Sequence, residues 1–518
     1  MSTAYDEVSY PAHMHPQAHP DRLAVMGRLF GMGTADIGRC RVLELGCGEG
    51  GNLIPAAFSL PTAQFLGIDL AEGAVARAAQ AARDLGLDNV DVRAMDIRSF
   101  PADAGRFDYI VAHGVYSWVP AEVRDRMLAI CRDHLADNGV AYVSYNAYPG
   151  ARLREIARET MRFGMAKPDG ANGSPPEVVR RSRALLKTIA DASAPGNEPY
   201  AAVLAGEVKR IEPIEDAVLF HDDLADLNEP VYFHEFAAHA ARFGFQYLSD
   251  ADYAETVDRP VRAGLAERLK ELAPEGDVVR REQFADFIRG RAFRRTLICH
   301  ARVTLTRPAR PQALRGLYVS SPVHPEKGDD TAASKAQSRF RTPKGLTLST
   351  NHPLARATLE RLGGAWPLTI SFDELLSPAG GAGVEPAAAD LGEFLLTAAA
   401  AGAVEFHTRA PKLSTTAGER PHASALARWQ ARRGAMVTTL TGASVKLEGV
   451  LARELLGLLD GTRDRAAVVN ELGRLFDGGR VMLSEGGIPV SSTRARQLFR
   501  DGIDDKLAQL ARLGLLVG

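Results

Sequence analysis

Val42-Leu-Glu-Leu-Gly-Cys-Gly-Glu-Gly50 is an apolar strand that runs directly into three closely spaced glycines, and a helical pattern follows from Gly51. Glycine can adopt positive φ angles, and it lets a ligand approach the main chain because no Cβ stands in the way. The first turn of a helix also presents unpaired N–H groups. The stretch predicts a strand, a ligand-binding turn and a helix, although glycines after a strand also fit an ordinary tight turn.

The next strand supplies an acidic residue where a ribose would be recognised. Residues 64–70 form an apolar run ending at Asp69, about twenty residues after the glycines, and a carboxylate there can accept hydrogen bonds from both ribose hydroxyls. The spacing Glu-x-Gly-x-Gly-x-Gly differs from the Gly-x-Gly-x-x-Gly pattern of dinucleotide sites. Glu44 and Glu49 would repel a pyrophosphate but attract a sulfonium and an ammonium. These residues favour S-adenosylmethionine over a dinucleotide.

Further strands and helices alternate along the chain. We predict strands at residues 90–97, 107–111 and 139–148, and helices at 72–85 and 121–135. Regular alternation of this kind predicts a parallel sheet with helices on both faces. A ligand should then lie beyond the carboxyl ends of the strands.

Two later strands complete a set of seven. A helix at 234–243 precedes strand six at 245–253, and the alternating residues 294–306 form strand seven. The stretch from about 151 to 230 is a mostly helical insertion, with Gly/Pro-rich interruptions at 167–176 and 194–199. Whether the insertion is a lid or an inert structural element stays open.

The composition changes after Thr306, where a Pro/Arg stretch at 307–311 reads as a hinge. Helical patterns separated by turns then occur twice, which predicts two winged-helix-like modules. Neither recognition helix is notably basic, so peptide or protein docking is favoured over DNA binding, with simple dimerisation as the alternative. We expect an N-terminal cap at 1–35, a catalytic domain at 36–306 with a helical insertion and regulatory region at about 151–300, a linker and first module at 307–415, and a second module at 416–518.

Residues 42–50 resemble throughout the first motif of the class I S-adenosylmethionine-dependent methyltransferase family. Similarity to its bacterial members with a methyltransferase regulatory domain covers nearly the whole chain and is carried by segments 5–11, 19–23, 29–31, 219–223 and 228–233. Some rickettsial members of that group are protein-lysine methyltransferases. The resemblance implies an α/β fold with a seven-stranded Rossmann-like methyltransferase sheet, a helical insertion and a mostly helical, winged-helix-like C-terminal region.

The resemblance also implies the cofactor, S-adenosyl-L-methionine, and its product, S-adenosyl-L-homocysteine. It places Asp96 on the adenine amino group, with its neighbours covering the ring. The predicted cofactor-binding residues are Glu44, Gly46, Gly48, Gly50, Asn52, Asp69, Leu70, Met95, Asp96, Ile97 and His113. No metal site is predicted.

Methyl transfer is an in-line displacement that needs an aligned nucleophile and exclusion of water. A lysine acceptor must be neutral, which burial favours, and aromatic faces attract the methylated product. The segments after strands four and five supply the predicted catalytic residues His113, Tyr116, Trp118 and Tyr148, with His113 orienting the nucleophile or taking its proton. The alternative is a hydrogen-bonded wall, which is the commoner role of a His or Tyr at the end of a strand. The substrate-side candidates are Tyr10, His19, Tyr145, Asn146, His221 and Asp223.

We therefore predict a methyltransferase that modifies protein lysine side chains. A methyltransferase of a small metabolite or modified peptide, and a non-catalytic S-adenosylmethionine-binding regulator, are the alternatives. Nucleic-acid methylation is disfavoured because Ala112-His-Gly-Val115 stands where an Asn/Asp-Pro-Pro-Tyr motif would be expected.

Composition sets the remaining limits. A net charge of −2 over 518 residues gives no general attraction to nucleic acid, and the arginine-rich stretch from Arg280 to Arg315 is expected to be a solvated face, with a docking patch for an acidic partner as the alternative. The four cysteines fit reduced thiols, and we see no signal peptide and no apolar run long enough to span a membrane. We expect a cytoplasmic enzyme with a protein or peptide substrate, and a homodimer stays open.

Overall fold

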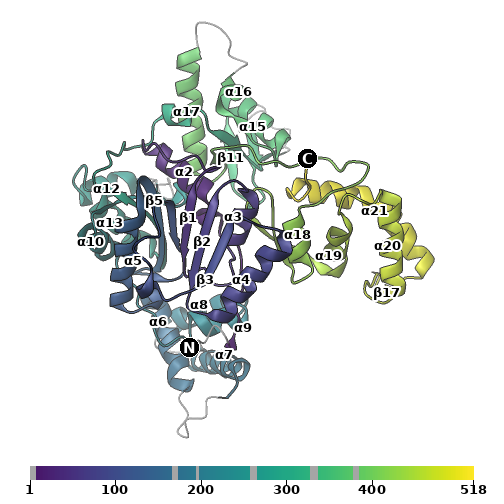
Figure 1. Cartoon of the computed structure of the whole chain (residues 1–518), viewed down its shortest axis with the longest axis horizontal. Helices are drawn as coiled ribbons and strands as arrows, with labels where there is room; N and C mark the ends of the chain where they lie inside the picture. Colours follow the sequence, from purple (N-terminus) through teal and green to yellow (C-terminus); the bar gives the residue numbers. More distant parts are fainter. Residues whose placement is uncertain (1–6, 166–172, 194–197, 257–264, 327–336, 377–383) are drawn as a thin grey trace.

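The computed structural model describes residues 7–165, 173–193, 198–256, 265–326, 337–376 and 384–518. Most of the Gly/Pro-rich pieces at 167–176 and 194–199 lies outside these residues. Figure 1 shows a central sheet with helices packed around it, helical groups at its lower and upper edges, and a lobe of C-terminal helices at one side. Within the described residues, no helix has the length and apolar character needed to cross a membrane.

The central sheet has seven strands in the order β3-β2-β1-β4-β5-β7-β6, which confirms the predicted set. The strands are β1 (Arg41–Leu45), β2 (Gln64–Asp69), β3 (Val90–Ala94), β4 (Phe107–Ala112), β5 (Leu135–Asn146), β6 (Phe245–Asp250) and β7 (Phe293–His300). Strands β1 to β5 pair in parallel. In contrast, β7 is antiparallel to both β5 and β6, so the expectation of an all-parallel sheet is wrong at this edge. Buried strands look alike in sequence whichever way they run, so direction could not be read from the apolar pattern.

Helices cover the sheet on both faces, and β1 is buried at every residue after Arg41. Helix α4 has its predicted bounds because Gly86, with a φ of 64°, ends it. The predicted N-terminal cap contributes α2 (Pro20–Leu29). Outside the insertion, the helices of the catalytic domain are α3 (Leu53–Ser59), α4 (Glu72–Leu85), α5 (Ala121–His134), α10 (Phe233–Arg242), α11 (Tyr253–Thr256), α12 (Leu265–Leu272) and α13 (Val278–Arg289).

The insertion is helical, as expected, and lies at the lower edge of the sheet in Figure 1. It consists of α6 (Ala151–Met165), α7 (Pro175–Ala192), α8 (Glu198–Ile211) and α9 (Asp216–Asp222). These helices bury a separate apolar cluster that includes Met161, Leu186 and Leu204. The insertion is therefore a small packed unit of its own.

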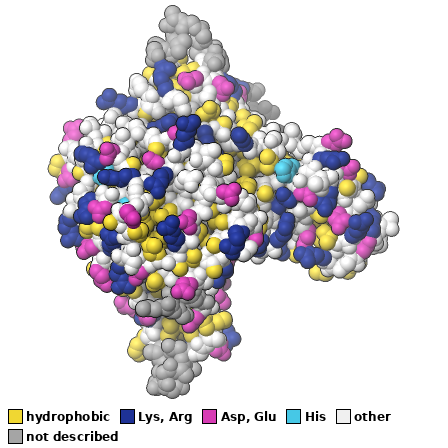
Figure 2. Space-filling model, viewed as in Figure 1, with side chains coloured by type: hydrophobic (Ala, Val, Ile, Leu, Met, Phe, Trp, Pro, Cys, Tyr) yellow, Lys and Arg dark blue, Asp and Glu magenta, His cyan; other side chains and the backbone are white. Residues whose placement is uncertain are grey.

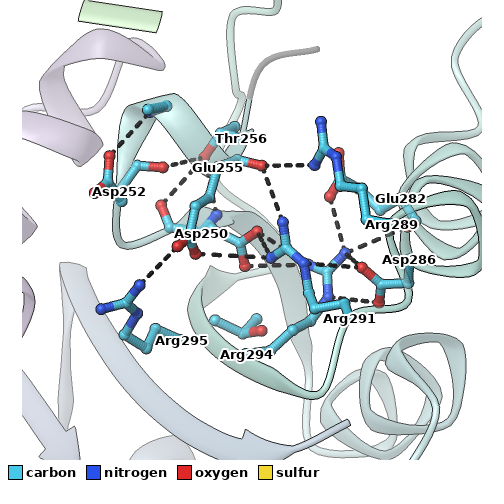
Figure 3. A network of polar contacts seen from close by, with 12 residues as sticks. Asp250, Asp252, Glu255, Thr256, Glu282, Asp286, Arg289, Arg291, Arg294 and Arg295 are labelled. Carbon is cyan, nitrogen blue, oxygen red and sulfur yellow. Dashed lines mark hydrogen bonds and ion pairs between the residues drawn. The ribbon is translucent and has the colours of Figure 1, made fainter. Parts of the chain in front are cut away.

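The edge of the sheet formed by β6 and β7 is tied to α13 by a buried ionic network (Figure 3). The fully buried Arg294 contacts Asp250 at 3.1 Å, Asp286 at 2.8 Å and Glu282 at 3.0 Å. Arg291 contacts the same Asp250 and Asp286 at 2.6 and 3.1 Å. The expectation of a solvated arginine face is therefore wrong here, because acids of β6 and α13 neutralise these two arginines inside the protein.

Residues 307–415 pack directly onto the catalytic domain. They contain a small antiparallel sheet in the order β12-β8-β13. Arg307 donates hydrogen bonds to the carbonyl oxygens of Tyr247 and Leu248 at 2.6 and 2.7 Å, so the predicted hinge at 307–311 is a packed segment. The elements of this region are β8 (Tyr318–Ser320), β9 (His324–Pro325), β10 (Ser338–Arg341), β11 (Thr347–Thr350), α15 (Pro353–Ala365), β12 (Ile370–Ser371), α16 (Phe372–Leu376), α17 (Val384–Ala400) and β13 (Glu405–His407).

The C-terminal lobe has its own apolar core, which includes Leu456, Leu472 and Leu510. Near the carboxyl end of this lobe, Leu516 forms a single antiparallel bridge with Ala423. On the face shown in Figure 2, basic and acidic side chains are interspersed over this lobe. Its elements are α18 (Ala425–Ala431), β14 (Met436–Thr438), β15 (Ser444–Lys446), α19 (Gly449–Leu458), α20 (Arg465–Asp477), β16 (Ser484–Glu485), β17 (Ile488–Pro489) and α21 (Ser492–Arg512).

Candidate functional site

A cavity of about 530 Å³ lies at the carboxyl ends of β1, β2 and β4, where the sequence predicts a ligand. The glycine turn forms its floor together with residues that follow β2, β3 and β4. Two further segments complete the wall. One is an N-terminal strap, residues 7–15, of which residues 10–13 and 15 line the cavity, and the other is the end of α9 at Asp222.

The glycine turn needs glycine for different reasons at different positions. Gly46, Gly48 and Gly50 have φ angles of 71°, 51° and 77°. A Cβ on Gly46 would lie 2.4 Å from Val115 Cγ2, whereas one on Gly48 would meet nothing within 4 Å. Gly48 therefore faces open space in the cavity. Gly50 instead packs against Ile54 and does not line the cavity, so its contact with the cofactor stays a prediction.

Glu44 is buried at the inner end of the cavity. Its Oε1 accepts a hydrogen bond from Asn52 Nδ2 at 3.0 Å, and Asn52 Oδ1 accepts one from the His15 N–H at 2.8 Å. Burial raises the pKa of Glu44 to about 8. A positively charged group bound beside Glu44 would favour its ionised form and would lower this pKa.

Asp69 lies at the end of β2 and also lines the cavity. Its Oδ2 accepts from the Gly48 N–H at 2.8 Å, and its Oδ1 accepts from the Ala71 N–H at 2.9 Å. These bonds fix the carboxylate beside the glycine turn. Glu49, in contrast, pairs with Arg77 at 2.8 Å, so its negative charge is already balanced.

Residues 95–98 form the wall after β3. Met95, Asp96 and Ile97 all line the cavity, as does Leu70. Asp96 caps the following turn by accepting from the Arg98 N–H at 2.8 Å, and it pairs with the Arg98 guanidinium at 2.6 Å. Arg98 itself lines the cavity and was not foreseen.

Two histidines lie in ring contact at another wall of the cavity, with their planes tilted by 32°. The rings of His15 and His113 have centroids 3.9 Å apart, and His113 Nδ1 lies 2.8 Å from the Tyr142 hydroxyl. Burial lowers the pKa of His15 to about 4 and that of His113 well below its ordinary value. Both imidazoles are therefore neutral at physiological pH.

The predicted catalytic residues separate into two groups. His113 and Trp118 line the cavity, whereas Tyr116 and Tyr148 do not. Tyr116 is buried, with its hydroxyl 2.7 Å from His239 Nδ1, and the Tyr148 hydroxyl donates to Glu155 Oε1 at 2.5 Å. Tyr116 points into the core and Tyr148 is partly exposed beside Glu155, so neither is placed on the wall of this cavity.

The strand-end candidates of β5 also point away from the cavity. Tyr145 is buried, and its hydroxyl lies 2.9 Å from Thr296 Oγ1. Asn146 Nδ2 donates to Asn228 Oδ1 at 2.9 Å, and Asn228 Nδ2 donates to the carbonyl of Asp222 at 3.3 Å. Asn146 thus ties the end of β5 to the end of α9.

The distant candidates are only partly brought together. Tyr10 lines the cavity and donates to Asp222 Oδ2 at 3.2 Å. His221 Nε2 lies 2.7 Å from the carbonyl oxygen of Val8 in the strap, and Asp223 pairs with Arg210. Neither His221 nor Asp223 lines the cavity.

His19 belongs to a different place in the fold. It caps α2 by accepting from the Asp21 N–H at 3.1 Å, and it lines a separate cavity of about 60 Å³. It cannot close the larger cavity from there.

Sequence reasoning missed His15 and Asp222. The adjacent acids at 222 and 223 were a signal, but a helix turns neighbouring side chains in different directions, so the sequence could not tell which one faces a cavity. Among the described residues, no group of three His, Cys, Asp or Glu side chains is arranged to hold a metal ion.

Comparison with known families shows three matches along the chain. Residues 42–139 match a methyltransferase domain, and residues 215–300 match a predicted methyltransferase regulatory domain. Residues 419–515 match the C-terminal winged helix domain of PKMT. The third match confirms a winged helix in the second predicted C-terminal module. The first module, at 307–415, stays a prediction as a winged helix.

Relatives and solved structures agree with these matches. Protein RP789 of Rickettsia prowazekii is 33% identical over 380 residues, which are 72% of this chain and 68% of that protein. Protein RP028 of the same organism is 36% identical over 47% of this chain and 96% of its own length. The structure of PKMT2 from Rickettsia typhi in complex with AdoHcy is 27% identical with a TM-score of 0.85, and it covers 98% of this chain and 100% of that one.

Proposed function

This chain belongs to the family of S-adenosylmethionine-dependent methyltransferases with a methyltransferase regulatory domain, and we propose that its methyl acceptor is the side-chain amine of protein lysine residues. The observation that carries the proposal is the match of 98% of the chain, C-terminal lobe included, to PKMT2 with its bound AdoHcy. A match confined to the sheet would support the cofactor but not the acceptor.

The cavity residues suit the cofactor. Asp69 would hold the ribose hydroxyls, Asp96 and its neighbours would hold the adenine, and Glu44 would balance the positive charge of the methionine part. The cofactor supplies a methyl group on a sulfonium, which is transferred directly. The protein's own contribution is to bind the cofactor and the lysine, to orient them and to exclude water. The N-terminal strap, which lines the cavity through residues 10–13 and 15, helps to exclude water.

The two histidines of the cavity wall are compatible with a positively charged cofactor. His15 and His113 carry no charge at neutral pH, so they add no repulsion against the sulfonium. Trp118 offers an aromatic side chain on the cavity wall, and an aromatic face attracts a methylated ammonium.

Label transfer tests the proposal. The protein is incubated with S-adenosylmethionine carrying a radioactive methyl group and with an extract of the source cells, and acid hydrolysis of the labelled protein should release N-methyl-lysine. Label on another amino acid overturns the lysine acceptor. Label in the small-molecule fraction supports the alternative of a metabolite or modified peptide, and binding without transfer supports a regulator.

The variant Asp69→Ala tests the predicted contact between Asp69 and the cofactor. Removing a charged acceptor of hydrogen bonds should weaken AdoHcy binding by about 10- to 100-fold, since such bonds contribute about 1.5–3 kcal/mol. Asp91→Ala, an exposed acid on β3, should leave AdoHcy binding unchanged. Equal affinities of the two variants in calorimetry would contradict the assignment of Asp69.

A cytoplasmic location stays part of this proposal. Its support is that all four cysteines are buried free thiols, which suits a reducing compartment.

A further inference from the structure

Five acidic side chains line the cofactor cavity, and they differ in what they already hold. Glu49 and Asp96 pair with arginines. Asp69 accepts from backbone N–H groups, and Glu44 accepts from the Asn52 amide. Asp222, the fifth, accepts a hydrogen bond from the Tyr10 hydroxyl at 3.2 Å. Its partner is thus a neutral phenol on the N-terminal strap.

The neighbours of Asp222 are engaged in other contacts. Asp223 and Glu207 both pair with Arg210, and His221 holds the strap through the Val8 carbonyl. The main chain of Asp222 is fixed through Asn228 to Asn146 at the carboxyl end of β5. The carboxyl group is thus held at a defined place on the cavity wall.

We propose that Asp222 binds the ε-ammonium group of the substrate lysine and accepts one proton from it. This proposal rests on the lysine acceptor proposed above. The proton passes from the lysine nitrogen to a carboxylate oxygen of Asp222. The nitrogen lone pair then forms the N–C bond to the methyl carbon, the C–S bond breaks, and its electron pair stays on sulfur. The product is a methylated ammonium, and Asp222 returns its proton to solvent when the product leaves.

The electrostatics of the cavity support Asp222 over the two histidines as the proton acceptor, while Glu44 is held at the glycine turn by Asn52. Burial, with the charge of Asp223 as a second cause, raises the pKa of Asp222 to about 7, against the lowering effects of the Tyr10 hydroxyl and of Arg210 and Arg154. A base with a pKa near the working pH is the most effective proton acceptor. His15 and His113 are weaker bases because burial lowers their pKa values.

The test compares Asp222→Asn with the wild type in the full-length protein. The probe is the protein fraction of the source-cell extract, and the readout is the initial rate of N-methyl-lysine formation between pH 6 and pH 10, together with the Kd of AdoHcy. At pH 7 we expect the variant to be about 100-fold slower, a typical contribution of a general base, with an unchanged AdoHcy Kd. The ratio of the wild-type rate to the variant rate should decrease steadily toward pH 10, because solvent then deprotonates lysine, whose ordinary pKa is about 10.4.

The outcomes separate the two proposals. If the wild type forms no N-methyl-lysine, the lysine acceptor itself fails. If the wild type forms it and Asp222→Asn is equally fast at pH 7, or equally slow at pH 7 and pH 10, the role of Asp222 is overturned. Tyr10→Phe should move the acidic limb of the wild-type profile to higher pH, because it removes a hydrogen bond that stabilises the ionised carboxyl. The control is Asp226→Asn, a fully exposed acid four residues further on, which should behave as wild type.

Discussion

The region at 307–415 and the winged helix domain at 419–515 are attached to the catalytic domain in different ways. In the first region, Leu317, Leu391 and Phe406 belong to the same buried cluster as Leu23 of α2 and Leu297 of β7. The winged helix domain has a separate core and contacts α4 mainly through α18. A boundary in composition is therefore a boundary between folding units only in the second case.

Polar contacts and a small apolar cluster join α18 of the winged helix domain to the catalytic domain. Trp429 Nε1 donates to Asp84 Oδ2 at 2.9 Å, and Arg433 pairs with the same oxygen at 2.7 Å. Leu426 packs on Ile54 in a small apolar cluster. Figure 1 shows the lobe standing at the side of the sheet. The region at 307–415 is therefore part of the catalytic body, whereas the lobe is a docked module.

Paired core substitutions should have the largest effect. Leu317→Ala and Leu456→Ala each remove a fully buried side chain, at a cost of about 3 kcal/mol. Leu317→Ala should lower the calorimetric transition that includes the cofactor site, and Leu456→Ala only that of the lobe. If Leu456→Ala lowers both transitions equally, the lobe is not a separate folding unit.

Binding of AdoHcy should stabilise the region at 307–415 but not the lobe. At a concentration of 100 times its Kd, AdoHcy should stabilise the body that contains its cavity by about 2.7 kcal/mol. The region at 307–415 should gain this protection with the sheet, whereas the lobe should not. Hydrogen exchange, read peptide by peptide, measures both, and equal protection of the lobe would be the contrary result.

Asp21→Asn weakens a link within the fused body. Asp21 Oδ2 lies 3.1 Å from His407 Nδ1, and Oδ1 accepts from the Thr408 N–H at 2.7 Å. Although burial alone would raise the pKa of Asp21, the hydrogen bonds from His407 and Thr408 hold it well below its ordinary value. We expect a loss of about 2 kcal/mol at pH 7 in urea unfolding.

The pH dependence checks the sign of this effect. A carboxyl with a lowered folded pKa stabilises the protein fully above its unfolded pKa of about 3.9, and the contribution is lost as the pH falls below that value. Wild type and Asp21→Asn should therefore converge in stability below pH 4. Asp103→Asn, at an exposed position, is the control, and a difference that persists in acid would argue against the link.

Asp84→Ala should have the smallest effect on stability. It removes the acceptor shared by Trp429 and Arg433, so the lobe should sample wider orientations while both cores stay intact. Small-angle scattering should show an increased maximum dimension, and Asp88→Ala, an exposed neighbour, should not. Identical scattering curves would mean that the apolar contact at Leu426 is sufficient.

Local patterns predicted the cofactor half of the site. Gly48 and Asp69 could be placed because a glycine turn and a strand-end acid are each set within a few residues of a buried strand. Met95, Asp96 and Ile97 were placed through the family resemblance, and they do line the cavity.

The rest of the site depends on tertiary packing. The turn at Tyr116–Trp118 sends Trp118 into the cavity and Tyr116 into the core, and nothing in the order of the two residues decides which goes where. Asp222 reaches the cavity from a helix far along the chain. Arg294 can be buried because Asp250 and Glu282 pair with it. These acids come close to Arg294 only in the folded protein, so its sequence neighbourhood does not reveal the burial.

The N-terminal strap is held at one end by His221 on the insertion and at the other by Ser444 of the lobe, whose hydroxyl donates to the Met14 carbonyl at 2.9 Å. Its main chain also passes so close to Gly51 that a Cβ there would lie 2.9 Å from the His13 carbonyl oxygen. We expect spent cofactor to leave only after this strap has been displaced. A partner protein that binds the lobe and changes its contact with Met14 would thereby alter the rate of cofactor exchange without contacting the central sheet.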